Sequence, residues 1–246
     1  MQKQTRKTIK LTIDDIKKAI KNMKPKILLK KNPNLLITNK EKDKNEIDQK
    51  LSRLRDQYTE LLPFVKGIKK HIKDITETTH VCAVYLSLCF AFQNWNSLFL
   101  LAEYGKNSAA LALIRMIRES LTLAELFALE FSKNERENLD KWCTGEIIPH
   151  RIGREMVSKF FDELSLIPNL LPPHYIKNLM TNLYQMESQV IHSSYAPILE
   201  CISPYTENFD FEGYTGFYRT KIFLKHAEGM MTATSSTLKL VYLLLL

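Results

Sequence analysis

Polar side chains interrupt an otherwise apolar segment, residues 107–131, at helical spacing. Arg115 and Glu119 are four residues apart, so on a helix they are neighbours, and Arg118 and Thr122 continue the polar stripe towards Glu125. Two kinds of chemistry fit this stripe. An ion pair satisfies guanidinium groups that are costly to bury alone, whereas an arginine fork also binds carboxylate or phosphate. The pattern favours the ion pair over the anion clamp.

A second candidate, His192, stands in QVIHSSYAP near the end of a helix predicted over residues 174–195. It lies on the polar face of that helix with Gln185, Ser188 and Gln189. A histidine that acts as a general acid or base needs a cleft and an orienting partner, and the sequence shows neither. The pattern therefore favours a surface histidine over a catalytic one.

A metal-binding pattern is also present. His71, Asp74, Glu77 and His80 recur every third residue. Glu77-x-x-His80 has the form that di-iron helical bundles use, but those sites need the motif twice, together with carboxylates from two further helices. The sequence has no second Glu-x-x-His, and three-residue steps drift around a helix, so the four side chains cannot all face one ion. We therefore predict a polar helix end, with no metal and no other cofactor.

Three motifs together resemble an uncharacterised bacterial family of all-helical proteins. They are LIRMIRES, WCTGEIIPHRIGRE and YQMESQVIHSSYAP, and the resemblance covers roughly residues 80–200. The family pairs a Leu-x-Arg-x-x-x-Glu helix with a later helix end that carries Ser and His. The resemblance implies a helical fold and a set of site residues, which are Arg115, Glu119, Trp142, Arg154 and His192. The chain departs from the family in having Met186-Glu187-Ser188 where a Leu-Ser pair is expected before the histidine.

Such families are compared with HEPN domains, the helical domains of toxin and defence ribonucleases, in which a His follows an Arg on one helix after about four to six intervening residues. Arg219 and His226 match, and a separation of seven places both on one helix face. By this resemblance the His would act as acid and base on a ribose 2′-hydroxyl and the Arg would stabilise the phosphorane, without metal. About 0.7 such matches arise by chance in a chain of this composition, and Thr220 replaces the Asn, Asp or His that often follows the Arg.

Composition indicates what must position these residues. The chain has 246 residues, of which 45% are hydrophobic and 25% charged, and this excludes collagen-like, disordered and disulfide-scaffold proteins. The net charge of +8 is uneven, because residues 1–50 hold 14 Lys and one Arg against six acids while the remainder is nearly neutral. Such a Lys-rich arm either binds RNA or another polyanion or only keeps the protein soluble. Because other residues interrupt the run of lysines, the pattern favours a solubilising segment over a polyanion-binding one.

The clearest pattern is a seam of apolar residues spaced alternately by four and three, which predicts one long helix. Its members are Ile47, Leu51, Leu54, Tyr58, Leu61, Val65, Ile68, Ile72 and Ile75. Pro63 and Gly67 interrupt the seam, so we expect a kink near residue 60. The seam fits a bundle helix or a dimerisation coiled coil, and the lack of paired charges beside it favours the bundle.

Further helices are predicted over residues 12–23, 78–103, 107–131, 134–161, 174–195 and from about 217 onwards. A break near Gly145 and Pro149 divides the fourth of these, and residues 31–45 are predicted to be a linker. We therefore predict an all-α protein, with a basic N-terminal arm that carries one short helix over residues 1–45. A single bundle of roughly six to eight helices follows over residues 46–246, with its core in 78–131 and 174–195.

Val81–Ala102 is 22 residues long without a formal charge, which is enough to span a bilayer. Its central Gln93, Asn94, Asn96 and Ser97 fit a buried bundle helix better than lipid, so no membrane span is predicted. The four cysteines lack C-x-x-C spacing, and the charged first thirty residues lack the apolar region of a signal peptide. We therefore predict a reducing cytoplasmic environment.

These features predict a cytoplasmic, non-enzymatic binding or interaction module that forms a homodimer or binds a partner. The alternative is a metal-independent, HEPN-like ribonuclease or nucleic-acid-binding protein of a defence or toxin system. The residues that would carry catalysis are Arg115, Glu119, His192, Arg219 and His226. The enzyme hypothesis requires Arg219 with His226, or Arg115 with His192, at one solvent-open cleft.

Overall fold

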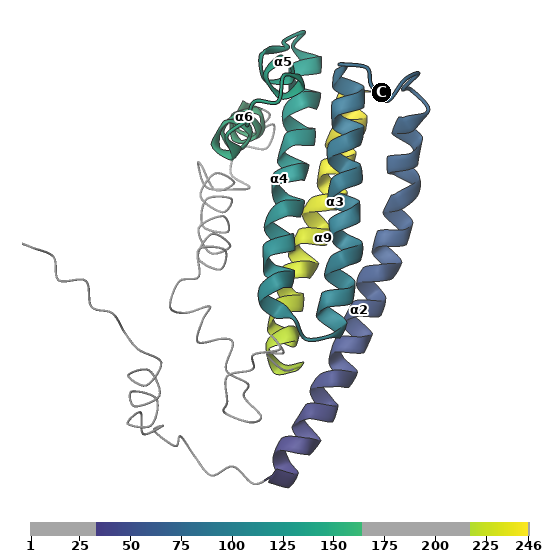
Figure 1. Cartoon of the computed structure of the whole chain (residues 1–246), viewed down its shortest axis with the longest axis vertical. Coiled ribbons are helices and arrows are strands. Elements are labelled where there is room, and N and C mark those ends of the chain that lie inside the picture. The colour runs from purple at the N-terminus through teal and green to yellow at the C-terminus, as the bar shows by residue number, and fades with distance from the viewer. Residues whose placement is uncertain (1–32, 164–216, 246) are drawn as a thin grey trace, which may run out of the picture.

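The computed structural model describes residues 33–163 and 217–245, which form an all-α bundle (Figure 1). Of this described part 84% is helical, in six helices and without strands, so the predicted all-α class is confirmed. The four long helices are α2 (Pro33–Lys69), α3 (His80–Glu103), α4 (Asn107–Ser132) and α9 (Phe217–Leu245). The two shorter ones are α5 (Glu137–Cys143) and α6 (His150–Glu163). Helix α3 runs antiparallel to α2, α4 and α9, while α5 sits at one end of α4 and α6 beside it.

The apolar seam predicted for α2 is buried against the other helices of the bundle. Ile47, Leu51 and Ile68 are at most 2% exposed. Tyr58 packs against Phe92 of α3, with 5.2 Å between the ring centroids. The seam therefore serves the interior of this chain, as the favoured interpretation predicted.

Helix α2 begins at Pro33, so the linker predicted over residues 31–45 is wrong for most of its length. Proline suits the first turn of a helix, because its φ angle is already helical and its missing N–H would have no partner there. The Lys and Glu residues that follow are good helix formers. The predicted boundary between arm and bundle, after residue 45, falls within one continuous helix.

Helix α2 ends at Lys69, although its apolar seam continues to Ile75 in the sequence. The α-helical hydrogen bonds give way here to tighter turns, in which the Lys70 N–H donates to the Gly67 carbonyl at 3.1 Å. Ile75 lies beyond the helix and is 48% exposed. The helix passes through Pro63 without ending. The prediction that this helix continues to Ile75 is therefore wrong.

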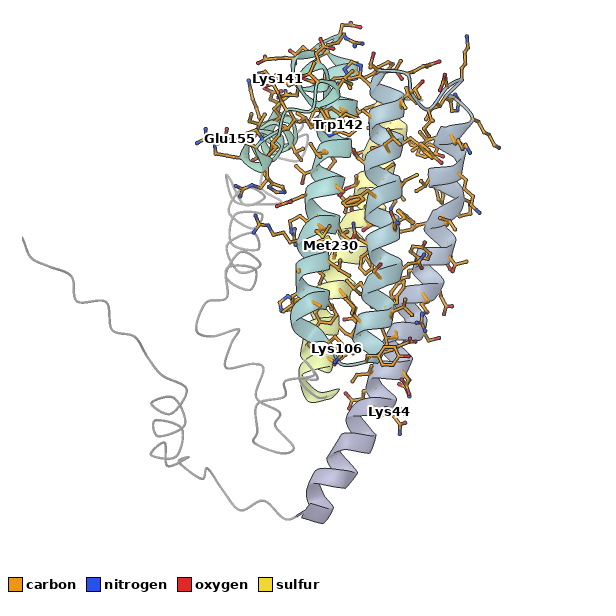
Figure 2. All side chains as sticks on the ribbon, in the orientation of Figure 1. Lys44, Lys106, Lys141, Trp142, Glu155 and Met230 are labelled. Atoms are coloured by element: carbon orange, nitrogen blue, oxygen red, sulfur yellow. The ribbon has the colours of Figure 1, made fainter. Side chains whose placement is uncertain are left out.

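The core lies between α2, α3, α4 and α9, and the apolar stretch over residues 78–131 predicted the part that α3 and α4 contribute. Trp95 of α3 is fully buried, and its indole N–H donates to the Thr234 hydroxyl of α9 at 3.2 Å. Met230 of α9 lies inside the bundle (Figure 2) and is 2% exposed. Residues 174–195, which were predicted to share the core, lie outside the described residues.

Helix α9 closes the bundle against α2. The Tyr242 hydroxyl donates to the Phe64 carbonyl at 2.7 Å, and the two rings meet edge to face with 5.7 Å between centroids. Gly67 makes room for this contact, because a β-carbon at that position would collide with the Tyr242 hydroxyl. A glycine that interrupts the α2 seam in the sequence thus allows close packing in the structure.

By length and composition, α3 is the one helix in the described part of the chain that could cross a membrane. Half of its most apolar window is buried within the bundle. Its central amide Asn94 is buried and donates to the Phe90 carbonyl at 2.9 Å, so this polar group finds a partner on its own helix. That the chain has no membrane span stays a prediction.

Candidate ligand pocket beside helix α4

The polar side chains of α4 face two different neighbours, α6 and α9. Arg115, Glu119 and Thr122 line a cavity on the side of α6. Glu125 instead accepts a hydrogen bond from the Thr237 hydroxyl of α9 at 2.5 Å. The Arg115 Nε–H donates to a Glu119 carboxylate oxygen at 2.8 Å, which confirms the predicted ion pair one helical turn apart. Whether the arginine also serves as an anion clamp depends on what surrounds the pair.

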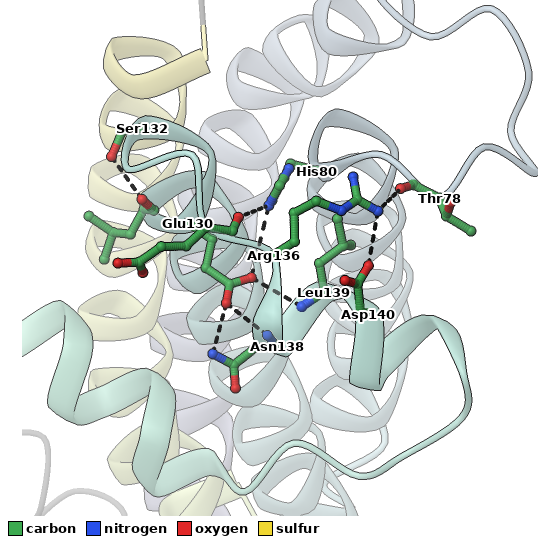
Figure 3. Close-up of polar contacts among 10 residues, drawn as sticks. Thr78, His80, Glu130, Ser132, Arg136, Asn138, Leu139 and Asp140 are labelled. Atoms are coloured by element: carbon green, nitrogen blue, oxygen red, sulfur yellow. Dashed lines mark hydrogen bonds and ion pairs between the residues drawn. The ribbon is translucent and has the colours of Figure 1, made fainter.

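Helix α5 is fixed to the end of α4 by Glu130 (Figure 3). This side chain is 1% exposed, and its carboxylate accepts the backbone N–H groups of Asn138 and Leu139 at 2.8 and 3.0 Å. It also accepts the Asn138 side-chain amide at 2.9 Å. N–H groups in the first turn of a helix have no partner within the helix, so Glu130 caps α5 from the preceding helix.

The chain turns back over α4 at the break that the sequence predicted. Gly145 has a φ of 86°, in the left-handed region that favours glycine. Helix α6 then begins at His150, directly after Pro149. At Gly153 it approaches α4 closely, because a β-carbon there would lie only 2.6 Å from the Thr122 Cγ2 atom. Any side chain at position 153 would hold the two helices farther apart.

A cavity of about 460 Å³ lies between α4, the end of α5, the loop after it and the start of α6. Arg115, Glu119, Glu146 and His150 contribute polar groups to its lining. Trp142 contributes an aromatic wall, and it lies at the end of the bundle beside α6 in Figure 2. The cavity thus joins an oriented guanidinium, a histidine and an indole.

Burial and nearby positive charge both change the pKa of His150. Burial lowers the pKa of its imidazole most, and the guanidinium groups of Arg154, Arg118 and Arg115 lower it further, so that it falls from 6.5 to about 4. His150 is therefore neutral at pH 7. The arginine charges that add to the effect of burial would also favour an anion beside His150.

Four of the five residues implied by the family resemblance meet here. Arg115, Glu119 and Trp142 line the cavity, and Arg154 is one of the arginines that act on its histidine. The fifth, His192, lies outside the described residues, so its pairing with Arg115 stays a prediction. The structure thus brings together residues of α4, α5 and α6, three helices that follow one another in the chain.

The Arg219 and His226 pair has no established place at this cavity. His226 is half-buried on α9 and does not line it. Arg219 belongs to the first turn of α9, but its side chain lies outside the described residues. The ribonuclease hypothesis built on this pair therefore stays a prediction.

Among the described residues, no group of three or more His, Cys, Asp or Glu is arranged to hold a metal ion. His80, from the three-residue repeat, instead donates its Nε2–H to the Glu135 carbonyl at 2.8 Å. It also lies 3.9 Å from the Glu130 carboxylate, beside the α5 cap (Figure 3). The structure assigns this histidine to the junction of α3, α4 and α5.

Sequence reasoning did not identify His150 or Glu146 as pocket residues. Both belong to WCTGEIIPHRIGRE, where Pro, His and Arg follow a predicted break, and this cluster was the available signal. The missing information was tertiary, because nothing in the spacing showed that α6 folds back onto the Arg115 side of α4.

Fold and site together define an all-α bundle with a polar pocket between helix α4 and the two short helices α5 and α6. Comparisons of the chain with protein-family models, with curated proteins and with solved structures found no match. The resemblance to an uncharacterised bacterial helical family therefore stays a prediction that its motifs carry.

Proposed function

We propose that the protein is a non-enzymatic binding module and that it takes a small ligand in the cavity beside α4. The observation that carries this proposal is the presence of Arg115 and Trp142 on the walls of one cavity of about 460 Å³. Small-molecule sites are concave and combine apolar walls with a few fixed polar groups. Ile148 and Leu123 supply further apolar wall here.

The groups that would contact a ligand are fixed by neighbouring side chains. The Arg115 side chain is 15% exposed and is oriented by its bond to Glu119. Trp142 packs against Phe127 of α4, with 5.3 Å between ring centroids. Side chains that are ordered before binding lose less conformational entropy when a ligand arrives. This order supports a ligand site over a crevice between mobile side chains.

The state of His150 favours binding over catalysis. A general base works best when its pKa lies near the working pH. His150, with a pKa of about 4, is a weak base at pH 7. The predicted cytoplasmic location, the homodimer and polyanion binding through the Lys-rich arm stay predictions from the sequence.

The two tryptophans of the chain provide the test. Trp142 lines the cavity and Trp95 is fully buried in the core, so their indole N–H signals in an NMR spectrum report on pocket and core separately. We would screen fragments in equal numbers of anionic, neutral and cationic compounds. A ligand of the pocket should shift the Trp142 signal and leave the Trp95 signal in place. Trp142→Phe identifies the pocket signal by removing it.

A matched pair of arginine variants completes the test. Arg115→Gln and Arg151→Gln remove the same charge, but Arg151 is 77% exposed on α6 and does not line the cavity. Binding of a pocket ligand should weaken in Arg115→Gln and stay unchanged in Arg151→Gln. A screen in which no compound moves the Trp142 signal would contradict the proposed function.

A further inference from the structure

Charged side chains of the described residues surround His150 on three elements. Arg115 and Glu119 of α4 and Glu146 after α5 line the cavity with it. Among the described residues, the charges that act on His150 are those of Arg154, Arg118 and Arg115. The Glu119 carboxylate is occupied by Arg115, and the Glu146 side chain is exposed, where water screens its charge. The charges of the described residues therefore make a positive contribution to the potential at His150.

We propose that the ligand of this pocket carries an oxyanion, such as a carboxylate, sulfonate or phosphate, beside Arg115 and His150, and that His150 takes up a proton when the oxyanion binds. This inference rests on the proposed function, because it names the ligand class and the pH response of the same cavity. The aromatic wall of Trp142 fits a ligand with a flat apolar part next to its charge.

The arrangement of charge supports the oxyanion. A guanidinium presents its N–H groups in a planar fork that matches the oxygens of carboxylate and phosphate. Glu119 holds the Nε side of the Arg115 fork, which fixes the orientation of the group. An oxyanion in the cavity would offset the arginines that repel a proton from His150.

The proton uptake follows from the same charges. An opposite charge close to a histidine favours its protonated form. A protonated His150 would then donate a charge-assisted hydrogen bond to the oxyanion. Because binding and protonation are linked, affinity must rise as the pH falls. Because burial, the largest cause of the low pKa, persists in the bound state, a full return of the His150 titration to its ordinary midpoint sets the upper limit, an affinity about 25-fold higher at pH 5 than at pH 7.5.

Three probes that share a phenyl ring test the ligand class. Benzenesulfonate, benzenesulfonamide and benzamidine carry charges of −1, 0 and +1 on the same ring, and none of them titrates between pH 5 and pH 8. Dissociation constants come from the shift of the Trp142 indole signal. We expect benzenesulfonate to bind at least tenfold more tightly than the sulfonamide, and benzamidine to bind most weakly. Arg115→Gln should remove this preference and Arg151→Gln should keep it.

A second readout tests the proton. The His150 ring signals, titrated with and without benzenesulfonate, should show a midpoint that moves up by at least one pH unit in the bound protein. The pH dependence of sulfonate affinity should disappear in His150→Gln. An affinity that is the same at pH 5 and pH 7.5, in wild type as in His150→Gln, would overturn the proton uptake.

The outcomes separate the two proposals. Equal or tighter binding of the neutral or cationic probe overturns the oxyanion while the pocket stands as a binding site. If none of the three probes binds, the fragment screen decides the ligand class. The oxyanion proposal requires that the compounds that shift the Trp142 signal be mainly anionic. Only a screen without any such compound counts against the proposed function itself.

Discussion

Helix α4 is buried on two sides by different means. Towards the bundle interior, Ile114, Ile117 and Phe127 are at most 1% exposed and the contacts are apolar. Towards α6 the same helix presents Arg115, and Gly153 brings the two backbones close beside a cavity. The interior side gains stability from the apolar area removed from water. The other side is positioned by a cap and a glycine contact, and it leaves space that a ligand can fill.

The largest expected effect lies on the interior side. Leu88→Ala removes a fully buried side chain of α3, and it should lower the free energy of unfolding by about 3 to 4 kcal/mol. Ile147→Ala, at a loop residue that is 91% exposed, should change it by no more than about 0.5 kcal/mol. Urea unfolding measures both. Similar losses of unfolding free energy in Leu88→Ala and Ile147→Ala would contradict the difference between the bundle interior and the α6 side.

The next effect concerns the cap of α5. Glu130→Ala removes the acceptor of three hydrogen bonds, and it should cost about 3 kcal/mol because bonds to a charged group are strong and the donors stay buried. Hydrogen exchange should locate the damage at the Asn138 and Leu139 amides. Glu137→Ala, whose exposed side chain pairs only with Lys141 among the described residues, should leave the free energy of unfolding nearly unchanged, because water screens such a surface pair. Unchanged protection of both amides would refute the capping role.

Two groups on opposite sides of α4 titrate in opposite senses. Burial raises the pKa of Glu125 from 4.5 to about 7, against the lowering effects of the Thr237 hydrogen bond and Arg118. Between pH 4.5 and 7 the unfolded chain loses a proton that folded Glu125 keeps, so stability falls as the pH rises. Between pH 6.5 and 4 the unfolded chain gains a proton that folded His150 lacks, so stability falls as the pH drops.

The two slopes oppose each other between about pH 4.5 and 6.5, and each reaches at most about 1.4 kcal/mol per pH unit. Relative to wild type, His150→Gln should therefore lose stability as the pH rises through this window. Glu125→Gln should lose stability, relative to wild type, as the pH falls. Urea unfolding at several pH values measures both differences. Difference profiles with the same sign would show that one of the two environments is misassigned.

The smallest effect tests the contact between α6 and α4. Gly153→Ala forces its new β-carbon against Thr122 Cγ2 and should cost about 1 to 2 kcal/mol. Thr122→Ser removes that methyl group, so the double variant should recover most of the loss. Gly229→Ala on α9 is the matched control, because a β-carbon there meets nothing within 4 Å and alanine favours helix by up to about 1 kcal/mol. If Gly153→Ala were as stable as Gly229→Ala, the close approach would be refuted.

Local patterns predicted much of the fold and only part of the site. The apolar runs of α3 and α4 and the Gly145 break gave helix bounds close to those observed, because burial and backbone preference agree there. The sequence around Pro33 predicts a linker although this residue starts helix α2, since proline suits both a linker and the first turn of a helix. The pairing of Arg115 with Glu119 follows from helical spacing alone.

Features that depend on long-range contacts could not be predicted from the sequence. His150 reaches the cavity only because α6 folds back over α4, and the capping role of Glu130 depends on the turn that follows it. That turn contains Asn134 in the left-handed region, with a φ of 54°. Neither the fold-back nor the turn leaves a periodic signal that spacing could reveal.

The contact between Tyr242 and Phe64 also predicts an order of assembly. Helices α3 and α4 are joined by three residues and can form a hairpin early, because loop closure over so short a distance costs little entropy. Tyr242 and Phe64 lie 178 residues apart in the chain, and contacts of such high separation slow folding. We therefore expect helix α9 to join a partly built bundle late. Substitutions at the contacts of α9 should then mainly raise the rate of unfolding, while substitutions between α3 and α4 should mainly lower the rate of folding.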